Sequence, residues 1–184
     1  TTVTQSGEIQ GIEIRNHDSR NQLVKETLLD ARKKVQSVAE YTWAPDGSPL
    51  TWISRNQANE VVIATNYRVI DGKVVGIELL DEKGNPIRIF DQTWNPQGQL
   101  VRKTERDPLS GSASVITYEY AGKLLVREAY SRADGTPVRA IEYSHDGQGV
   151  PNELRFLDRR GNITEIRKQE YRLFSHTETI TVFE

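Results

Sequence analysis

Apolar and polar residues alternate along short stretches of this chain. Ile77 and Leu79 flank Glu78, and the same pattern is found in residues 87–89 and 154–156. A period of two places successive side chains on opposite faces of a β-strand. The stretches are about eight residues long and carry charge on one side, which predicts antiparallel strands with one apolar and one solvated face.

Turn residues separate these stretches at intervals of 11 to 14 residues. Four residues before six of the glycines stands a large apolar residue, so apolar-x-x-x-Gly is a repeating unit. Most turn positions are Gly and two are Asn, the residues that best tolerate positive φ, so we expect a left-handed residue in each turn. The predicted turn positions are Gly7, Asn21, Lys33, Gly47, Asn59, Gly72, Gly84, Gly98, Gly111, Gly122, Gly135, Gly147 and Gly161.

One segment also fits a helix. Residues 22–40 contain no Gly or Pro and place apolar residues three and four apart. However, residues 29–35 overlay on residues 157–163 of a hairpin repeat. The repeat therefore favours two strands here.

The pattern predicts an all-β fold, an antiparallel β-meander of about 14 short strands built from hairpin repeats. So wide a sheet usually curls, closes or splits into layers, which leaves a curved sheet, a flattened barrel and a sandwich open. We expect one β-repeat domain over residues 1–184 with its aromatic face inward. No turn follows residues 176–183, which predicts a C-terminal edge strand able to pair with a partner strand.

The segment 157–164 reads Leu-Asp-Arg-Arg-Gly-Asn-Ile-Thr, and residues 17–23, 80–85 and 118–124 follow the same pattern less closely. These repeats resemble the tyrosine–aspartate (YD) repeats of the Rhs family, although Leu or Trp often replaces the tyrosine here and the aspartate is frequently missing. The resemblance implies an extended β surface used for binding, commonly bacterial and located in the envelope or outside the cell. A second resemblance, to the MORN-like hairpin repeats of antitoxin or immunity proteins, implies the cytoplasm.

The amino-acid composition excludes several classes of partner and site. The 24 Lys and Arg residues are balanced by 26 Asp and Glu residues, so no nucleic acid partner is expected. The absence of Cys removes disulfides, Cys-based zinc sites and thiol nucleophiles. No apolar run approaches the roughly 20 residues of a membrane helix. Because Met is absent even at position 1, we expect any signal peptide or lipid anchor to lie upstream of Thr1.

No catalytic motif, metal site or cofactor site is expected. Two of the three histidines, His17 and His145, stand beside a turn Asp, which favours a surface role, and His176 lies in the C-terminal strand. Nothing matches a nucleophile elbow, a phosphate loop or a dinucleotide fingerprint. Glycan hydrolysis stays open, because 26 acidic residues offer many carboxylate pairs.

Trp52 is the candidate ligand-binding residue. Trp43 and Trp94 occupy the apolar position of the repeat, which favours packing, whereas Trp52 falls outside that register and is expected to be exposed. The sequence therefore predicts a non-enzymatic binding or scaffold module of a bacterial envelope or secreted protein that presents a β-sheet surface to a protein or glycan. The alternatives are a cytoplasmic antitoxin or immunity protein and a periplasmic carrier of an apolar ligand.

Overall fold

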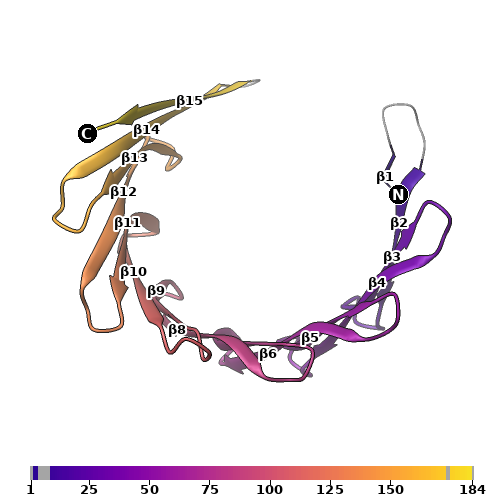
Figure 1. Ribbon diagram of the computed structural model, residues 1–184. Coiled ribbons are helices and arrows are strands. Elements are labelled where there is room, and N and C mark those ends of the chain that lie inside the picture. Colours follow the sequence, from indigo (N-terminus) through magenta and orange to yellow (C-terminus); the bar gives the residue numbers. More distant parts are fainter. Residues whose placement is uncertain (1, 4–8, 173–174, 184) are drawn as a thin grey trace. The chain divides into compact units, whose positions relative to one another are not determined.

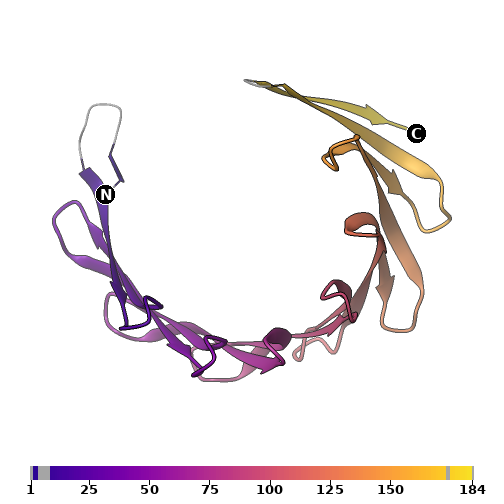
Figure 2. The same cartoon turned by 180° about the vertical axis from the view of Figure 1, so that it is seen from behind.

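The structure, a computed structural model, describes residues 2–3, 9–172 and 175–183. All regular structure in these residues is β-strand, and the strands follow one another in chain order (Figures 1 and 2). Neighbouring strands pair antiparallel. The predicted all-β meander is therefore confirmed. Fifteen strands are described, close to the predicted number of about 14.

Contacts divide the chain into two compact units, which are residues 1–91 with 107–110 (unit 1) and residues 92–106 with 111–184 (unit 2). Unit 1 contains β1 (Thr2–Val3), β2 (Ile9–His17), β3 (Leu23–Asp30), β4 (Val35–Trp43), β5 (Pro49–Asn56), β6 (Val61–Ile70), β7 (Lys73–Leu80) and most of β8 (Pro86–Trp94). Unit 2 contains β9 (Leu100–Arg106), β10 (Ala113–Ala121), β11 (Leu124–Arg132), β12 (Pro137–His145), β13 (Pro151–Leu157), β14 (Ile163–Arg172) and β15 (Ser175–Val182).

Within each unit the sheet is a single layer. A described strand contacts only its neighbours in the chain, and the strand order ends at β1 and β15. The buried hydrophobic residues of the described part are Val115, Ala140 and Ile141, and no large side chain there is fully buried. Within each unit the sheet is therefore open, and the flattened barrel and the sandwich are wrong. Cross-strand side-chain pairs, rather than a covering layer, stabilise such a sheet.

Apolar and charged side chains occur on both faces. In unit 1, Val38 is paired with Arg55 on one face, and Leu79 is paired with Arg88 on the other. The prediction of one apolar and one charged face is therefore wrong. The prediction assumed that one face is buried, but within unit 1 no second layer of described residues covers either face.

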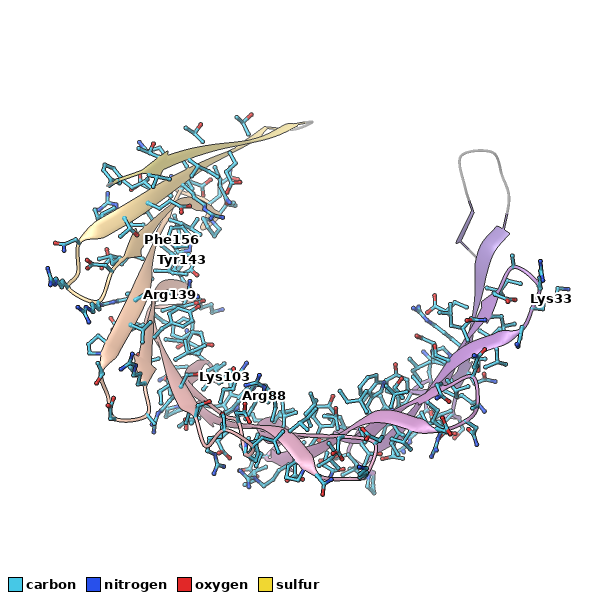
Figure 3. The ribbon with its side chains drawn as sticks, viewed as in Figure 1. Lys33, Arg88, Lys103, Arg139, Tyr143 and Phe156 are labelled. Atoms are coloured by element: carbon cyan, nitrogen blue, oxygen red, sulfur yellow. The ribbon has the colours of Figure 1, made fainter. Side chains whose placement is uncertain are left out.

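Residues 22–40 form two strands and not a helix. β3 and β4 pair through residues such as Thr27 with Val38, and Lys33 lies in the turn between them (Figure 3). Lys33 has a φ of 63°, the left-handed conformation predicted for it. The two-strand prediction is confirmed because pairing with neighbouring strands outweighs the local helical spacing.

Seven turns share a hydrogen-bonding pattern set by an Asp or Asn at their first position. In the turn of residues 158–162, Asp158 Oδ1 accepts the backbone N–H of Arg160 at 2.8 Å and of Asn162 at 2.9 Å. The Gly161 N–H donates to the carbonyl of Asp158 at 3.1 Å. Such side-chain acceptors replace part of the ladder where the chain reverses. The other six turns begin at Asp18, Asp30, Asn56, Asp81, Asn95 and Asp146.

The fourth residue of these turns has positive φ. Gly147 is an exception to the sequence prediction, because its turn starts at Asp146 and the left-handed residue is Gly149, with a φ of 82°. Gly7 lies outside the described residues. Positive φ is found at the remaining predicted positions, Asn21, Lys33, Gly47, Asn59, Gly72, Gly84, Gly98, Gly111, Gly122, Gly135 and Gly161.

The two glycines of the Asp146 turn provide a matched test. We expect Gly149→Ala to lower the free energy of unfolding by about 1–2 kcal/mol, because a Cβ is strained at this φ and would lie 3.3 Å from Leu124 Cδ2. Gly147→Ala should change it by less than about 0.5 kcal/mol, since a Cβ there meets no atom within 4 Å. Urea unfolding followed by circular dichroism measures both. Equal losses in the two variants would contradict the assignment of Gly149 as the left-handed residue.

The turn carboxylates predict a defined acid sensitivity. Backbone hydrogen bonds, from Val150 to Asp146 and from Asn162 to Asp158, hold the pKa of each carboxyl below its ordinary value. Because the folded pKa is depressed, this stabilisation is present above the unfolded value of about 3.9 and is lost as the pH falls through the folded pKa.

Asn56 and Asn95 hold the same turn without charge. The variant Asp146→Asn/Asp158→Asn should therefore fold at neutral pH and lose less stability than the wild type below about pH 4, as measured by urea unfolding at several pH values. The control Asp71→Asn/Glu82→Gln removes two carboxylates that make no hydrogen bond among the described residues. It should lose as much stability below about pH 4 as the wild type does. If the first variant loses as much stability at acid pH as the wild type, the two turn carboxylates are not the cause of the acid sensitivity.

Candidate binding surfaces

Trp52 lies in a row of side chains that crosses unit 1. Its cross-strand partners are Tyr41 on β4 and Thr65 on β6, so all three share one face. Thr65 is only 3% exposed, and Trp52 is half-buried. The row continues with Leu79 and Arg88 on β7 and β8. The expectation that Trp52 is exposed is therefore wrong, because Tyr41 and Thr65 flank it, and ligand binding by Trp52 stays a prediction.

Two aromatic residues at strand ends donate hydrogen bonds to the backbone of the neighbouring strand. The indole Nε1 of Trp43 donates to the carbonyl of Leu23 at 2.8 Å, and the hydroxyl of Tyr120 donates to the carbonyl of Leu100 at 3.0 Å. Each bond satisfies a polar group of a half-buried ring. Trp43 and Tyr120 thus have a structural use in the sheet, as the repeat position of Trp43 predicts.

The described residues contain no cluster of three His, Asp or Glu side chains able to hold a metal ion. None of them forms a helix of the length and apolarity needed to cross a membrane.

Unit 2 carries a second aromatic surface, which we call the tyrosine–arginine face. The register places Tyr118 opposite Glu128, and Glu128 opposite Ile141. Tyr130 and Arg139 are also direct cross-strand partners. Successive side chains of a strand point to opposite faces, so the register brings these side chains to one face; Figure 3 labels three of its residues, Arg139, Tyr143 and Phe156. The face consists of Tyr118, Glu128, Tyr130, Arg139, Ile141, Tyr143, Phe156 and Arg167.

Glu128 lies among three tyrosines, Tyr118, Tyr130 and Tyr143, which we call the tyrosine cluster. The hydroxyl of Tyr130 donates to Glu128 Oε2 at 2.6 Å. Burial, followed by this hydrogen bond and the carboxylate charge, raises the pKa of Tyr130 to about 12. Burial and the charge of Glu128 also raise the pKa of Tyr118 and Tyr143 above the ordinary value. Tyr130 therefore stays protonated at neutral pH, and its hydrogen bond holds the carboxylate in place.

Two arginines stack on aromatic rings of this face. The guanidinium carbon of Arg139 lies 4.3 Å from the ring centroid of Tyr130, and that of Arg167 lies 4.8 Å from the centroid of Phe156. Arg167 is also paired with Glu165. Arg139 makes no ion pair among the described residues, so its charge is available to a ligand. Cation–π stacking holds both guanidinium groups above flat rings.

Sequence reasoning missed this face as a candidate site. It assigned Tyr118 and Tyr143 to the apolar position of the repeat and did not use Tyr130. The available signal was the spacing of 12 and 13 residues between these tyrosines, which matches one strand and turn. That spacing could not reveal Glu128 or Arg139 as neighbours, because strand register decides which residues lie opposite each other.

The opposite face of unit 2 contains a shallow depression with a volume of about 440 Å³. Its floor consists of small or apolar residues of β10 to β13, and the turns of residues 133–136 and 158–162 border it. Beside it, Arg127 lies opposite Glu119 on one side and Glu142 on the other. The floor residues are Thr117, Ala129, Ser131, Ala140 and Leu157.

No family model and no curated protein matches this chain. Among solved structures, the chain is similar to a porin-like protein from Bacteroides uniformis, with 13% identity, a TM-score of 0.49, and coverage of 97% of this chain and 91% of that one. It is also similar to TcdB2-TccC3 without its hypervariable C-terminal region, with 11% identity, a TM-score of 0.44 and coverage of 94% of this chain.

A TcdB2-TccC3-Cdc42 structure gives 10% identity, a TM-score of 0.24 and coverage of 93% of this chain. This chain spans only 13% and 14% of the length of the two TcdB2-TccC3 chains. With such low identities and TM-scores, these similarities assign no function to it.

Replacing Glu128 tests the electrostatics of the tyrosine cluster. We expect Glu128→Gln to lower the titration midpoint of Tyr130 from about 12 toward the ordinary value of about 10, because the variant removes the carboxylate charge and leaves burial. NMR of tyrosine labelled at Cζ resolves the individual rings. The control Glu119→Gln removes a carboxylate from the opposite face of β10 and should leave Tyr130 unchanged. The same shift in both variants would contradict the cluster.

Proposed function

We propose that this chain is a non-enzymatic binding module that holds a protein partner on the tyrosine–arginine face of unit 2. The observation that carries the proposal is the stacking of Arg139 on Tyr130, on the face that also carries Tyr143 and Phe156. Tyr, Phe and Arg are the residues that protein interfaces concentrate at their centres. No other described strand of unit 2 covers this face.

The face is arranged before a partner binds. Tyr130 is hydrogen-bonded to Glu128, and the rings below hold Arg139 and Arg167. Ordered side chains lose less conformational entropy on association than mobile ones, so more of the contact energy appears as affinity. Arg139 supplies a charge for an acidic group of the partner, and the tyrosines supply flat amphipathic contact area.

A binding role is favoured over catalysis by the state of Glu128. A general acid or base needs a proton that can leave or arrive near the working pH. Glu128 instead accepts a hydrogen bond from a tyrosine whose pKa is raised to about 12. This arrangement fixes the side chains and keeps the proton on Tyr130 near neutral pH.

We place the module in the bacterial envelope or outside the cell. This placement rests on the resemblance of residues 157–164 to the YD repeat unit. A cytoplasmic immunity protein is the alternative that the MORN-like resemblance implies.

Site-specific photo-cross-linking in the source cell tests both parts of the proposal. A benzophenone side chain at position 130 should give one covalent protein adduct, found in the envelope or the medium. The same group at position 131, which lies on the opposite face, should not give it. An adduct found only in the cytosol would overturn the envelope placement.

With the adduct identified, affinity for the purified partner completes the test. Arg139→Ser/Phe156→Ser should weaken binding by roughly a hundredfold, as expected for two interface-centre residues. Arg155→Ser, a charge change on the opposite face, should weaken it by less than about threefold. Equal losses would refute the assignment of the tyrosine–arginine face.

A further inference from the structure

The depression on the opposite face of unit 2 is a second candidate site, and Tyr130 and Arg139 are the residues that its lining shares with the tyrosine–arginine face. Its floor combines two hydroxyl side chains, Thr117 and Ser131, with the apolar side chains of Ala129, Ala140 and Leu157. Ala140 is only 6% exposed, so the floor is firmly packed. A volume of about 440 Å³ lies within the range of small-ligand sites.

Arginines supply the charge around this depression. Arg159 and Arg160 line it from the turn between β13 and β14, and their exposed side chains make no ion pair or hydrogen bond among the described residues. Arg127 reaches the floor, where its Nε is buried without a hydrogen-bond partner in the described part of the chain. Its Nη1 lies 4.0 Å from Glu119 Oε1, a long contact that leaves most donors of the guanidinium unused.

Asp158 lines the depression together with Arg159 and Arg160, and its carboxylate is already satisfied. Asp158 Oδ1 accepts two backbone N–H groups, and its Oδ2 accepts the side-chain amide of Asn162 at 3.1 Å. Its charge therefore serves the turn. Glu119 and Glu142 are the cross-strand partners of Arg127, so the guanidinium groups available to a ligand at the depression are those of Arg159 and Arg160.

We propose that the depression binds one residue of an acidic saccharide, with the sugar carboxylate or sulfate on Arg159 and Arg160. Guanidinium groups bind such oxyanions through paired, charge-assisted hydrogen bonds. The hydroxyls of Thr117 and Ser131 match the hydroxyls of a sugar ring, and the Ala and Leu side chains match its C–H face.

The size and lining favour a saccharide over an acidic peptide. An Asp or Glu side chain is short and offers only a carboxylate, so it would leave most of the depression filled with water. The two hydroxyl groups of the floor would then have no partner in the ligand. A pyranose ring occupies the floor and brings hydroxyls to both.

The test is calorimetric titration of the full chain with a galacturonic acid trisaccharide. The neutral galactose trisaccharide and a tri-glutamate peptide are titrated in parallel. We expect the uronic acid probe to bind, the affinity to fall as salt is added, and the neutral sugar to bind at least about tenfold more weakly.

Matched variants localise the binding. Arg159→Ser/Arg160→Ser should lower the affinity for the uronic acid probe by roughly tenfold or more, since it removes charge-assisted hydrogen bonds. The control Arg32→Ser/Lys34→Ser removes two positive charges from the equivalent turn of unit 1, where Asp30 accepts the N–H of Arg32 as Asp158 accepts that of Arg160. It should change the affinity by less than about twofold.

A further variant blocks the space without changing charge. Ala129→Leu should lower the affinity for the uronic acid probe, while the circular dichroism spectrum of the variant stays that of the wild type. Three results would overturn the proposal: no binding of the uronic acid probe, equal binding of the tri-glutamate peptide, or equal losses in the two charge variants. Because the probe is a saccharide and no variant changes Tyr130, Arg139 or Phe156, these outcomes are distinguishable from those of the protein partner proposed above.

Discussion

Antiparallel backbone pairing between strands adjacent in the sequence is the interaction on which the rest of this structure depends. Each described strand contacts only its chain neighbours, and no large side chain of the described residues is fully buried. The usual covered core is therefore replaced by ladders of backbone hydrogen bonds and by side-chain pairs across them. Such contacts are local in the sequence, so short repeats are sufficient to encode them.

The turns convert this local pairing into a defined surface. An Asp or Asn at the first turn position, as at Asp158, and a left-handed residue three positions later fix where each strand restarts. A slip of one residue would move every side chain to the other face. The turn chemistry thus decides that Tyr130 meets Arg139, and that Glu128 lies beside Tyr118.

A single-layer sheet leaves two faces open to ligands. In unit 2 these faces differ in chemistry. One presents aromatic rings with stacked arginines such as Arg139, which suits a broad protein contact. The other presents a depression of about 440 Å³ with arginines at its rim, which suits a small anionic group. Because successive side chains along a strand point to opposite faces, each strand contributes to both faces. The two sites are therefore built from the same few hairpins.

The sequence by itself determined the strand class, the hairpin order and most turn positions, because period-two alternation and turn residues act over a few neighbours. It resolved residues 22–40 into two strands through the repeat, although the local spacing is helical. It misplaced one left-handed residue at Gly147, since choosing between Gly147 and Gly149 requires the hydrogen bonds of Asp146. Only the tertiary structure decided that the sheet is open, that Trp52 is half-buried beside Tyr41, and that Glu128, Tyr130 and Arg139 form one face. These features depend on register across several strands, which involves residues that are distant in the sequence.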